Sequence, residues 1–543
     1  MSTVHTPQNA TARPAAKRSA TAGLPADPEA ARALAARLIP DREWRPASVD
    51  AVAKLPAFAA KMRECGRVSR TPYTELPHYV TAALELRRLQ QMVHTVLLNP
   101  AWRDRLAAAG IDRAPATYEE WQDIPLSDKD VQREFYMGAR PGLVVPLDRG
   151  GFEVVASGGT SSGSPLEVVY ALRELADTYD IAGQFMGDYQ LAAHFPPDGP
   201  KWLFTTLADY QMWSSGTMVG GVLAKVPGVN YIGAGPVTAP VFEHMFSYPG
   251  AKALMGISAG IAILGELGAG LNREARETFR IALYGSGVLP HRKRAELQAV
   301  YPNLVILSYF AATQAETIGL QLHPATPWLT AVPGLHLVEI VDEDGRWVAE
   351  GEEGELVVTR LHAHEAPLLR LKLGDRMVRR PRLAGPGLQA DQFEFAGRTG
   401  DILHINDSQY SAARAYAALA TELRNAGVVD LDEAAHEVQF VNHREAKTIT
   451  LLASVDDVVG LTYRKDMMLG LDGVQRIFVN ALPRALSLFN HGEANPASVQ
   501  KTGYGLRLVF VPRLSPAIER TAVGKVPLVR DRASRATPEP RRE

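Results

Sequence analysis

The segment from residue 157 to residue 165, which reads Ser-Gly-Gly-Thr-Ser-Ser-Gly-Ser-Pro, offers the clearest chemistry in the sequence. Glycines let a backbone approach an anion closely, and here they are Gly158, Gly159 and Gly163. Hydroxyl groups can donate to phosphate oxygens, and here they come from Ser157, Thr160, Ser161 and Ser162. The segment predicts a phosphate-binding loop, although a hairpin tip without a ligand is the alternative for these residues alone.

The two common phosphate loops do not account for this segment. A Walker loop needs a lysine directly after its last glycine, and Ser164 stands there. A Rossmann loop opens a helix, whereas the runs on either side, 152–156 and 166–170, are strand-like. We therefore expect the loop to join two strands.

The elements that position this loop can be predicted from the pattern of apolar, β-branched and turn residues along the chain. Apolar residues recur at helical spacing over 84–96, which indicates an amphipathic helix. Short β-branched and aromatic runs then alternate with helical segments and turns, which is typical of an α/β fold. These runs are 143–146, 152–156, 166–170, 202–205, 281–284, 304–307 and 337–341.

Near Gly397 the pattern of expected strands and helices changes again, which predicts a boundary between two domains. The two ends of the chain are expected to form tails. We expect a disordered tail at 1–40, because its Ala, Thr, Pro and Ser content gives no apolar face. A large multi-layer α/β body is expected at 41–399 and a smaller α+β cap at 400–529, followed by a charged tail at 530–543.

Length, charge and cysteine content exclude several classes of protein. The chain has 543 residues, room for two to four domains, and a net charge of −2, so no general attraction to nucleic acid or anionic membranes is expected. The single cysteine, Cys65, excludes an internal disulfide. The longest apolar stretch, 253–265, is too short to span a bilayer. We expect a cytoplasmic protein with no nucleic-acid or membrane partner, and a homodimer is left open.

The 157–165 loop resembles the phosphate loop of the adenylate-forming (acyl-adenylate synthetase) superfamily, usually written S-S-G-T-T-G-x-P. The residues around it, together with 99–103, 107–112 and 124–129, are most similar to the phenylacetate–CoA ligase branch. Further motifs of the superfamily follow in its order, at Glu316, Asp375, Arg398 and Lys525. The resemblance implies ATP-dependent conversion of a carboxylic acid into an acyl adenylate with release of pyrophosphate.

The resemblance also implies roles for particular residues in binding ATP. The loop would hold the phosphates, and Glu316 would bind Mg²⁺ and take part in catalysis. Ala315 stands where the superfamily has Thr or Ser, so Thr313 is expected to supply that hydroxyl. Asp375 and Arg398 would bind the ribose, and Ser286 and Gly287 would lie along the adenine. ATP and Mg²⁺ are thus the implied cofactors.

Catalysis and acid binding are assigned in the same way. Lys525 lies in an R-T-x-x-G-K signature, where a cation would offset charge that develops in the transition state. Gly400 occupies the superfamily's hinge position. The acid pocket is expected to include Trp213, Gly256, Ser258, Tyr309, Phe310 and Ala311. Their aromatic rings favour an aromatic acid, with buried structural aromatics as the alternative.

The acceptor of the acyl group stays open. Asp407 stands where this branch has a glycine that borders the pantetheine tunnel, which puts coenzyme A in doubt. The alternatives are a coenzyme A ligase, an amide-forming ligase with an amine acceptor, and a nitrite-activating diazotase of secondary metabolism. The departures at Ala315, Gly400 and Asp407 also leave room for a nucleotide-binding homologue without turnover.

Overall fold

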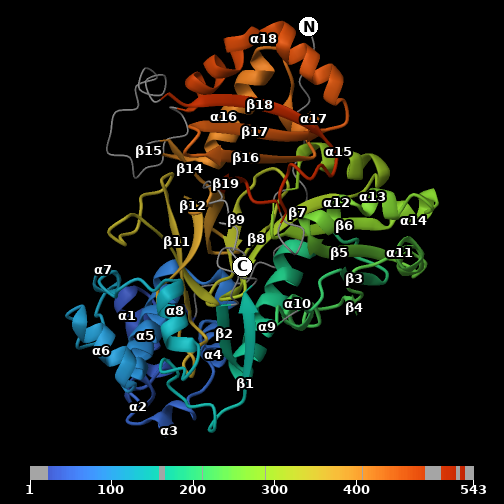
Figure 1. The fold of residues 1–543 in the computed structure, drawn as a ribbon. Helices are drawn as coiled ribbons and strands as arrows, with labels where there is room; N and C mark the ends of the chain where they lie inside the picture. The colour runs from blue at the N-terminus through green and yellow to red at the C-terminus, as the bar shows by residue number, and fades with distance from the viewer. Residues whose placement is uncertain are drawn as a thin grey trace, which may run out of the picture.

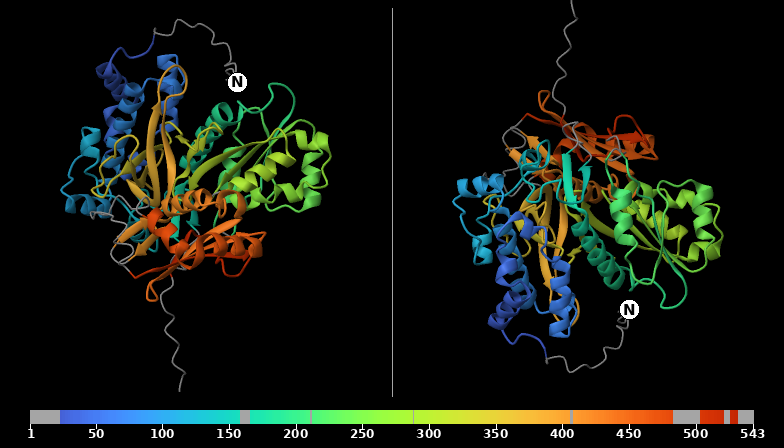
Figure 2. Two further views of the ribbon diagram at one scale, coloured as in Figure 1. Left: turned by 90° about the horizontal axis from the view of Figure 1, so that it is seen from above. Right: turned by 90° about the horizontal axis from the view of Figure 1, so that it is seen from below.

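The computed structural model describes residues 23–157, 166–210, 212–287, 289–405, 408–482, 503–520 and 526–531. A large α/β body carries a small cap, which lies at the top of Figure 1. In Figure 2 the first helices of the chain, in blue, and the green part of the body lie on opposite sides of yellow strands.

The N-terminal part of the body is a helical layer. Asp27 caps its first helix, because the Asp27 side chain accepts a hydrogen bond from the Ala30 N–H. The layer contains α1 (Pro28–Leu38), α2 (Asp41–Trp44), α3 (Val49–Val52), α4 (Phe58–Ser69), η1 (Tyr73–Glu75), α5 (His78–Val96), α6 (Pro100–Ala108), α7 (Tyr118–Trp121) and α8 (Lys129–Tyr136). Placing residues up to 40 in a tail was wrong for α1. Its Leu34 and Leu38 are buried in the core of this layer, so its apolar face has a partner.

A sheet of eleven strands, ordered β10-β11-β12-β13-β9-β8-β7-β6-β5-β3-β4, runs through the body. Its parallel half consists of β3 (Lys201–Thr205), β4 (Asn230–Gly233), β5 (Ala251–Ile257), β6 (Phe279–Gly285) and the start of β7 (Val305–Ala312). Its antiparallel half continues from the end of β7 through β8 (Glu316–Gln321), β9 (Leu329–Ala331), β10 (His336–Val341), β11 (Glu353–Arg360), β12 (Leu371–Leu383) and β13 (Ala390–Arg398).

The parallel strands are apolar on both faces because helices cover both. Alternate residues such as Leu203 and Ala253 pack on one face with α9 (Leu172–Phe185) and α10 (Ser215–Leu223). Their chain neighbours Phe204 and Leu254 pack on the other face. That face is covered by α11 (Ala239–Phe246), α13 (Leu264–Leu267) and α15 (His291–Val300). The shorter α12 (Ser258–Ala262), α14 (Arg273–Glu277) and the π-helix η2 (Met186–Leu191) complete the body.

A separate antiparallel pair, β1 (Phe152–Ser157) and β2 (Leu166–Ala171), carries the glycine-serine loop. Ser157 pairs with Leu166, which confirms that the loop joins two strands. The strand predicted at 143–146 was wrong. The N–H groups of Val144 and Val145 donate to the Glu365 carbonyl instead, so this buried segment satisfies its backbone without a sheet partner.

The cap has a sheet of its own, ordered β18-β17-β16-β19, and its own apolar core. Its elements are β14 (Ile402–Ile405), β15 (Ser408–Ser411), α16 (Ala412–Asn425), α17 (Leu431–Ala434), β16 (Glu437–His443), β17 (Thr448–Val455), α18 (Val458–Ala481), β18 (Gly505–Pro512) and β19 (Val529–Asp531). The α/β body and the α+β cap match the expected fold class. Across the described ranges, no helix is long and apolar enough to cross a membrane.

Ion pairs connect the cap to the body. Arg292 of α15 pairs with Asp456 of the cap, and Arg513 of the cap pairs with Glu266 of α13 at 2.9 Å. In each pair the carboxylate is more than half exposed, at 54% and 63%. The contact between the cap and the body is therefore polar and solvent-exposed at these two points.

Candidate functional site

The carboxyl ends of β5, β6 and the parallel part of β7 meet at one edge of the sheet, where open α/β sheets bind ligands. Tyr309 lies across this edge and donates a hydrogen bond to the Gly256 carbonyl at 3.3 Å. A Cβ at Gly285 would come within 2.5 Å of the Tyr309 ring, so glycine is required for this close packing. Burial raises the pKa of Tyr309 above its usual range, which keeps its hydroxyl protonated. The edge therefore brings together two of the predicted pocket residues, Gly256 and Tyr309.

The loop after β6 is held by a serine on the neighbouring helix. Ser258 donates to the carbonyls of Gly285 and Gly287, at 3.1 Å and 2.6 Å. Ser286 between them has a φ of +61°, a left-handed conformation that costs free energy for a residue other than glycine. The predicted adenine-binding residues Ser286 and Gly287 thus lie beside the predicted pocket residue Ser258.

The two predicted ribose-binding residues are direct neighbours. Asp375 of β12 lies opposite Arg398 of β13 in the sheet register. The Arg398 Nε donates to Asp375 Oδ1 at 3.2 Å. The Asp375 side chain is 7% exposed and that of Arg398 is 60% exposed, so the carboxylate is fixed while the guanidinium reaches solvent. Gly400 follows two residues later, and a Cβ there would meet nothing within 4 Å. Its hinge role stays a prediction.

Two further contacts bring predicted residues to the β1–β2 hairpin. The Tyr170 hydroxyl at the end of β2 donates to the Thr313 carbonyl, which fixes the turn that contains buried Ala315. The Met212 carbonyl accepts from the Ala156 N–H of β1 at 2.8 Å, so the turn that carries Trp213 lies against the same hairpin.

Other predicted residues are dispersed or outside the described ranges. Phe310 follows Tyr309 in the strand and packs on the opposite side, 6.2 Å from the Phe395 ring, while Ala311 is exposed. Ser157 ends β1. Gly158, Gly159, Thr160, Ser161, Ser162, Gly163, Asp407 and Lys525 lie outside the described residues.

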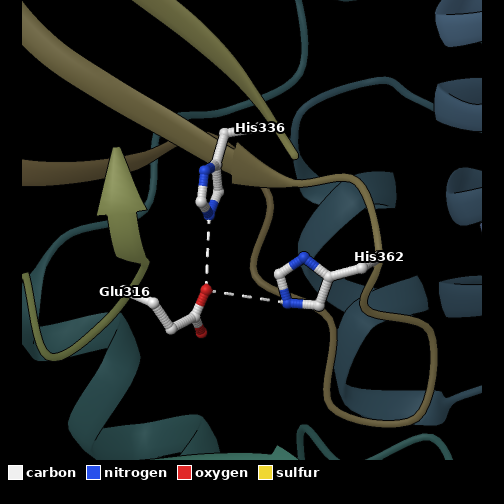
Figure 3. Close-up of side chains that lie close together, drawn as sticks. All are labelled: Glu316, His336 and His362. Atoms are coloured by element: carbon white, nitrogen blue, oxygen red, sulfur yellow. Dashed lines mark ion pairs between the residues drawn. The ribbon is translucent and has the colours of Figure 1, made fainter. Parts of the chain in front are cut away.

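Glu316 has the least expected surroundings of the predicted residues. It is the first residue of β8 and has a φ of +45°. Its carboxylate Oε2 lies 3.6 Å from His336 Nε2 and 3.9 Å from His362 Nε2 (Figure 3). The three side chains are buried, with exposures of 4%, 1% and 2% respectively. We call Glu316, His336 and His362 the unpaired cluster, because no side-chain nitrogen or carboxylate oxygen in it has a hydrogen-bond partner among the described residues.

The unpaired cluster does not fit the Mg²⁺ that the resemblance implied for Glu316. Mg²⁺ prefers oxygen ligands, often water and phosphate, whereas this cluster offers two imidazoles. Burial lowers the pKa of His362 to about 3, against smaller opposing contributions that include the Glu316 carboxylate, so its ring is neutral near pH 7. We therefore derive no step through a magnesium ion on Glu316.

Sequence reasoning missed His336 and His362. Both come from strand ends far from Glu316 in the chain, and four strands separate β8 from β10 in the sheet order. The run His362-Ala363-His364-Glu365 was the available signal, because metal-binding and catalytic residue types are concentrated there.

The same run contributes to a second buried group, which we call the paired cluster: Glu174, His364 and Glu365. Glu174 accepts hydrogen bonds from the N–H groups of His364 and Glu365, at 2.8 Å and 3.0 Å. Arg173 lies 2.8 Å from His364 Nε2 and pairs with Glu365. Arg88 lies 3.4 Å from His364 Nδ1. Burial raises the pKa of Glu174 to about 7.

Comparison with known proteins rests on structure, because no family model and no curated protein matches the sequence. A crystal structure of 2-hydroxyisobutyryl-CoA ligase in the postadenylation state, in complex with 2-HIB-AMP, superposes with a TM-score of 0.61 at 16% identity. The match covers 84% of this chain and 91% of that ligase. The chain therefore shares the fold of this ligase.

The chain superposes to different degrees on crystal structures of the same ligase in different states. An open conformation in complex with 2-HIB-AMP and CoA gives a TM-score of 0.58 at 15% identity, over 85% of this chain and 94% of that one. The thioesterification state gives 0.50 at 16% identity, over 84% and 91%. The chain therefore superposes better on the postadenylation state than on the thioesterification state.

Proposed function

We propose that the protein is an ATP-dependent adenylate-forming ligase that activates a carboxylic acid as its acyl adenylate. The observation that carries the proposal is the fold match over 84% of the chain to a ligase crystallised with an adenylate. The strand-end edge at Gly256 and Tyr309 supports it, because open α/β sheets bind ligands at the carboxyl ends of parallel strands. The Asp375–Arg398 pair supports it as well, because a fixed carboxylate can accept hydrogen bonds from two ribose hydroxyls.

In the proposed first step a carboxylate oxygen attacks the α-phosphorus of ATP. A bond forms between that oxygen and phosphorus, the bond to the β-phosphate oxygen breaks, and pyrophosphate leaves. The Asp375 carboxylate accepts from the ribose hydroxyls, and Arg398 holds Asp375 in place. Lys525 is proposed to neutralise the charge that develops between the two anions. ATP is proposed to enter as its Mg²⁺ complex.

In the second step an acceptor attacks the acyl carbonyl, the carbon–oxygen bond to AMP breaks, and the acceptor loses its proton. Excluding water is essential, since an acyl adenylate hydrolyses otherwise. Coenzyme A, an amine and another nucleophile remain the candidates for this acceptor, and the acid itself is proposed to be small or aromatic.

Pyrophosphate exchange into ATP tests the first step. The full-length chain is incubated with labelled pyrophosphate, ATP, Mg²⁺ and single acids from a panel of aryl and short-chain carboxylates, with nitrite as a further arm. We expect exchange that depends on at least one carboxylate. Exchange with nitrite alone would replace the carboxylate proposal with a diazotase, and no exchange with any of them would overturn it.

Lys525→Ala tests the proposed catalytic residue. We expect exchange to fall by about 10²-fold or more, because electrostatic stabilisation of a transition state is commonly worth that much. Lys447→Ala on the cap surface is the control and should exchange like the unmodified chain. Unchanged exchange in Lys525→Ala would remove Lys525 from the mechanism.

A further inference from the structure

We propose that Glu316, His336 and His362 bind one divalent transition-metal ion of the Zn²⁺ class. This inference is independent of the adenylation proposal, since it rests on three side chains and not on any substrate. It assigns Glu316 a metal of a different kind from the one that accompanies ATP.

The first argument is that the unpaired cluster has unmet bonding capacity. The two carboxylate oxygens of Glu316 and all four ring nitrogens of His336 and His362 lack a hydrogen-bond partner within the described part of the chain. Buried polar atoms are almost always bonded, because leaving one without a partner costs free energy. One cation would satisfy three of these atoms at once.

The second argument is geometric. Both rings direct Nε2 toward the same carboxylate, as Figure 3 shows, and the rings cross at 80° with centroids 5.8 Å apart. The three ligand atoms lie within 4.8 Å of one another. A tetrahedral Zn²⁺ with bonds of about 2.0–2.1 Å separates its ligands by roughly 3.3–3.4 Å. The 3.6 Å and 3.9 Å distances from Glu316 to the rings need only a small contraction.

The third argument is the donor set. Two imidazole nitrogens and one carboxylate oxygen suit Zn²⁺, Fe²⁺, Co²⁺ or Ni²⁺, and do not suit Mg²⁺ or Ca²⁺. Three protein ligands leave a fourth position for water or another oxygen. The left-handed backbone at Glu316 fits this assignment, since strained residues collect where a ligand fixes a side chain.

Arg360 and Tyr170 are the competing partners for Glu316, and the Tyr170 hydroxyl already donates to the Thr313 carbonyl. The Arg360 guanidinium carries charge that acts on the Glu316 carboxyl, and it stacks on the Tyr170 ring with its carbon 4.3 Å from the centroid. Its Nη2 donates to the carbonyls of Val169 and Ala366. Within the described residues it forms no ion pair with Glu316, and it leaves both imidazoles without a partner. A metal accounts for all three side chains, whereas Arg360 accounts for one.

The position suggests what the ion does for the fold. β8 and β10 are separated by four strands in the sheet order, and no backbone ladder joins them in the described structure. A metal bound by the first residue of each strand, and by the segment after β11, would join these ends directly. Its removal should loosen the turn that carries Ala315 and Glu316.

Metal content is the direct test. The untagged full-length chain is stripped with chelator, dialysed against Zn²⁺ and then against metal-free buffer, and measured by mass spectrometry. We expect about one ion per chain, which resists dialysis as expected for ligands held in a buried site. Less than about one-tenth of an ion per chain, after loading with Zn²⁺, Co²⁺ or Ni²⁺, would overturn the proposal.

Variants locate the ion. His336→Gln and His362→Gln should each lower retained metal at least tenfold, because removal of a ligand weakens such sites strongly. His364→Gln, in the adjacent paired cluster, and His323→Gln, on the surface, are the controls and should retain it. Equal loss in the controls would overturn the assignment to these residues.

The absorption spectrum of bound Co²⁺ tests the site in the wild-type chain, so its result does not depend on whether a variant folds. Co²⁺ in the stripped wild-type chain should give the visible bands of a four- or five-coordinate nitrogen and oxygen site. Zn²⁺ should raise the unfolding temperature by several degrees while Mg²⁺ does not. A featureless six-coordinate spectrum together with no thermal shift would contradict the proposal without any substitution.

Discussion

The unpaired and paired clusters use the same residue types, and one short segment after β11 contributes to both. His362 faces Glu316 and His336, while His364 two residues later faces Glu174, Arg88 and Arg173. The paired cluster is completed by arginines, which lie beside the ring nitrogens of His364 and balance carboxylate charge. The unpaired cluster has no such donor within hydrogen-bonding distance. We therefore propose a metal ion only for the cluster that no arginine completes.

The largest expected effect comes from removing an arginine of the paired cluster. Arg88 is buried and donates to the carbonyls of Leu361 and Ala363 and to Gln91. Arg88→Met should lower the free energy of unfolding by about 3–5 kcal/mol, because these acceptors and Glu174 lose a buried donor and charge. Urea denaturation measures it.

Arg87→Met on the same helix is the control for this prediction. Arg87 stacks on Trp44 and pairs with Asp41, whose side chain is 91% exposed. Its removal should cost about 1 kcal/mol or less. If both substitutions cost the same, the buried arginine does not distinguish the two clusters.

The pH dependence of stability is the second test of the difference between the two clusters. The Glu174 pKa is raised from 4.5 to about 7, so between these values the folded chain holds a proton that the unfolded chain has lost. The contribution of Glu174 to the free energy of unfolding should then fall as pH rises through this window, by about 1.4 kcal/mol per unit and roughly 3 kcal/mol in all, and buried Glu85, whose pKa is also raised to about 7, adds a fall in the same direction. Denaturation at several pH values should show a shallower fall in Glu174→Gln. The exposed Glu350→Gln should leave the slope unchanged.

Exchanging one histidine of each cluster compares them directly. In chelator, His364→Leu should destabilise the chain by about 2–3 kcal/mol, since Arg88 and Arg173 lose a buried partner. His336→Leu should change stability by only about 1 kcal/mol, because its nitrogens have no hydrogen bonds to lose. Chemical denaturation of the two variants measures both. Equal losses of stability in the two variants would contradict the proposed difference between the two clusters.

The smallest effect is expected at the rim of the paired cluster. Arg173 is 43% exposed, so solvent screens its pair with Glu365. Arg173→Gln should lower stability by about 1 kcal/mol, and thermal unfolding can measure the difference. Arg113→Gln, which breaks an exposed pair with Glu120, is the control and should cost less. A loss as large as that of Arg88→Met would contradict the assignment of Arg173 to the rim.

Motifs local in sequence were the predictable part of this molecule. The runs on either side of the glycine-serine loop form a hairpin, and Asp375 and Arg398 pair across adjacent strands. The hairpin follows from short strands whose pattern is visible in the chain. Asp375 and Arg398 were found through the family resemblance, and they lie on strands of 13 and 9 residues that the pattern did not predict. The body and cap were likewise predictable from changes of texture.

Features that depend on distant packing were not predictable. His336 reaches Glu316 because the sheet brings together the ends of strands that are not neighbours in its order. Residues 143–146 read as a strand, yet their backbone bonds to Glu365. α1 has an apolar face. The sequence prediction missed it because the composition was averaged over the first forty residues.

The ion pairs between cap and body have a consequence for how this arrangement responds to its solution. In the pairs Arg292–Asp456 and Arg513–Glu266 the carboxylates are more than half exposed to water, and such pairs each contribute about 0–1 kcal/mol. At an ionic strength of 0.15 M the screening length is about 8 Å, and it shortens as salt is added. Added salt should therefore weaken the contact between the cap and the body at these two points. For the ligase proposed above, contacts this weak at these two points would let the cap change position between the two half-reactions.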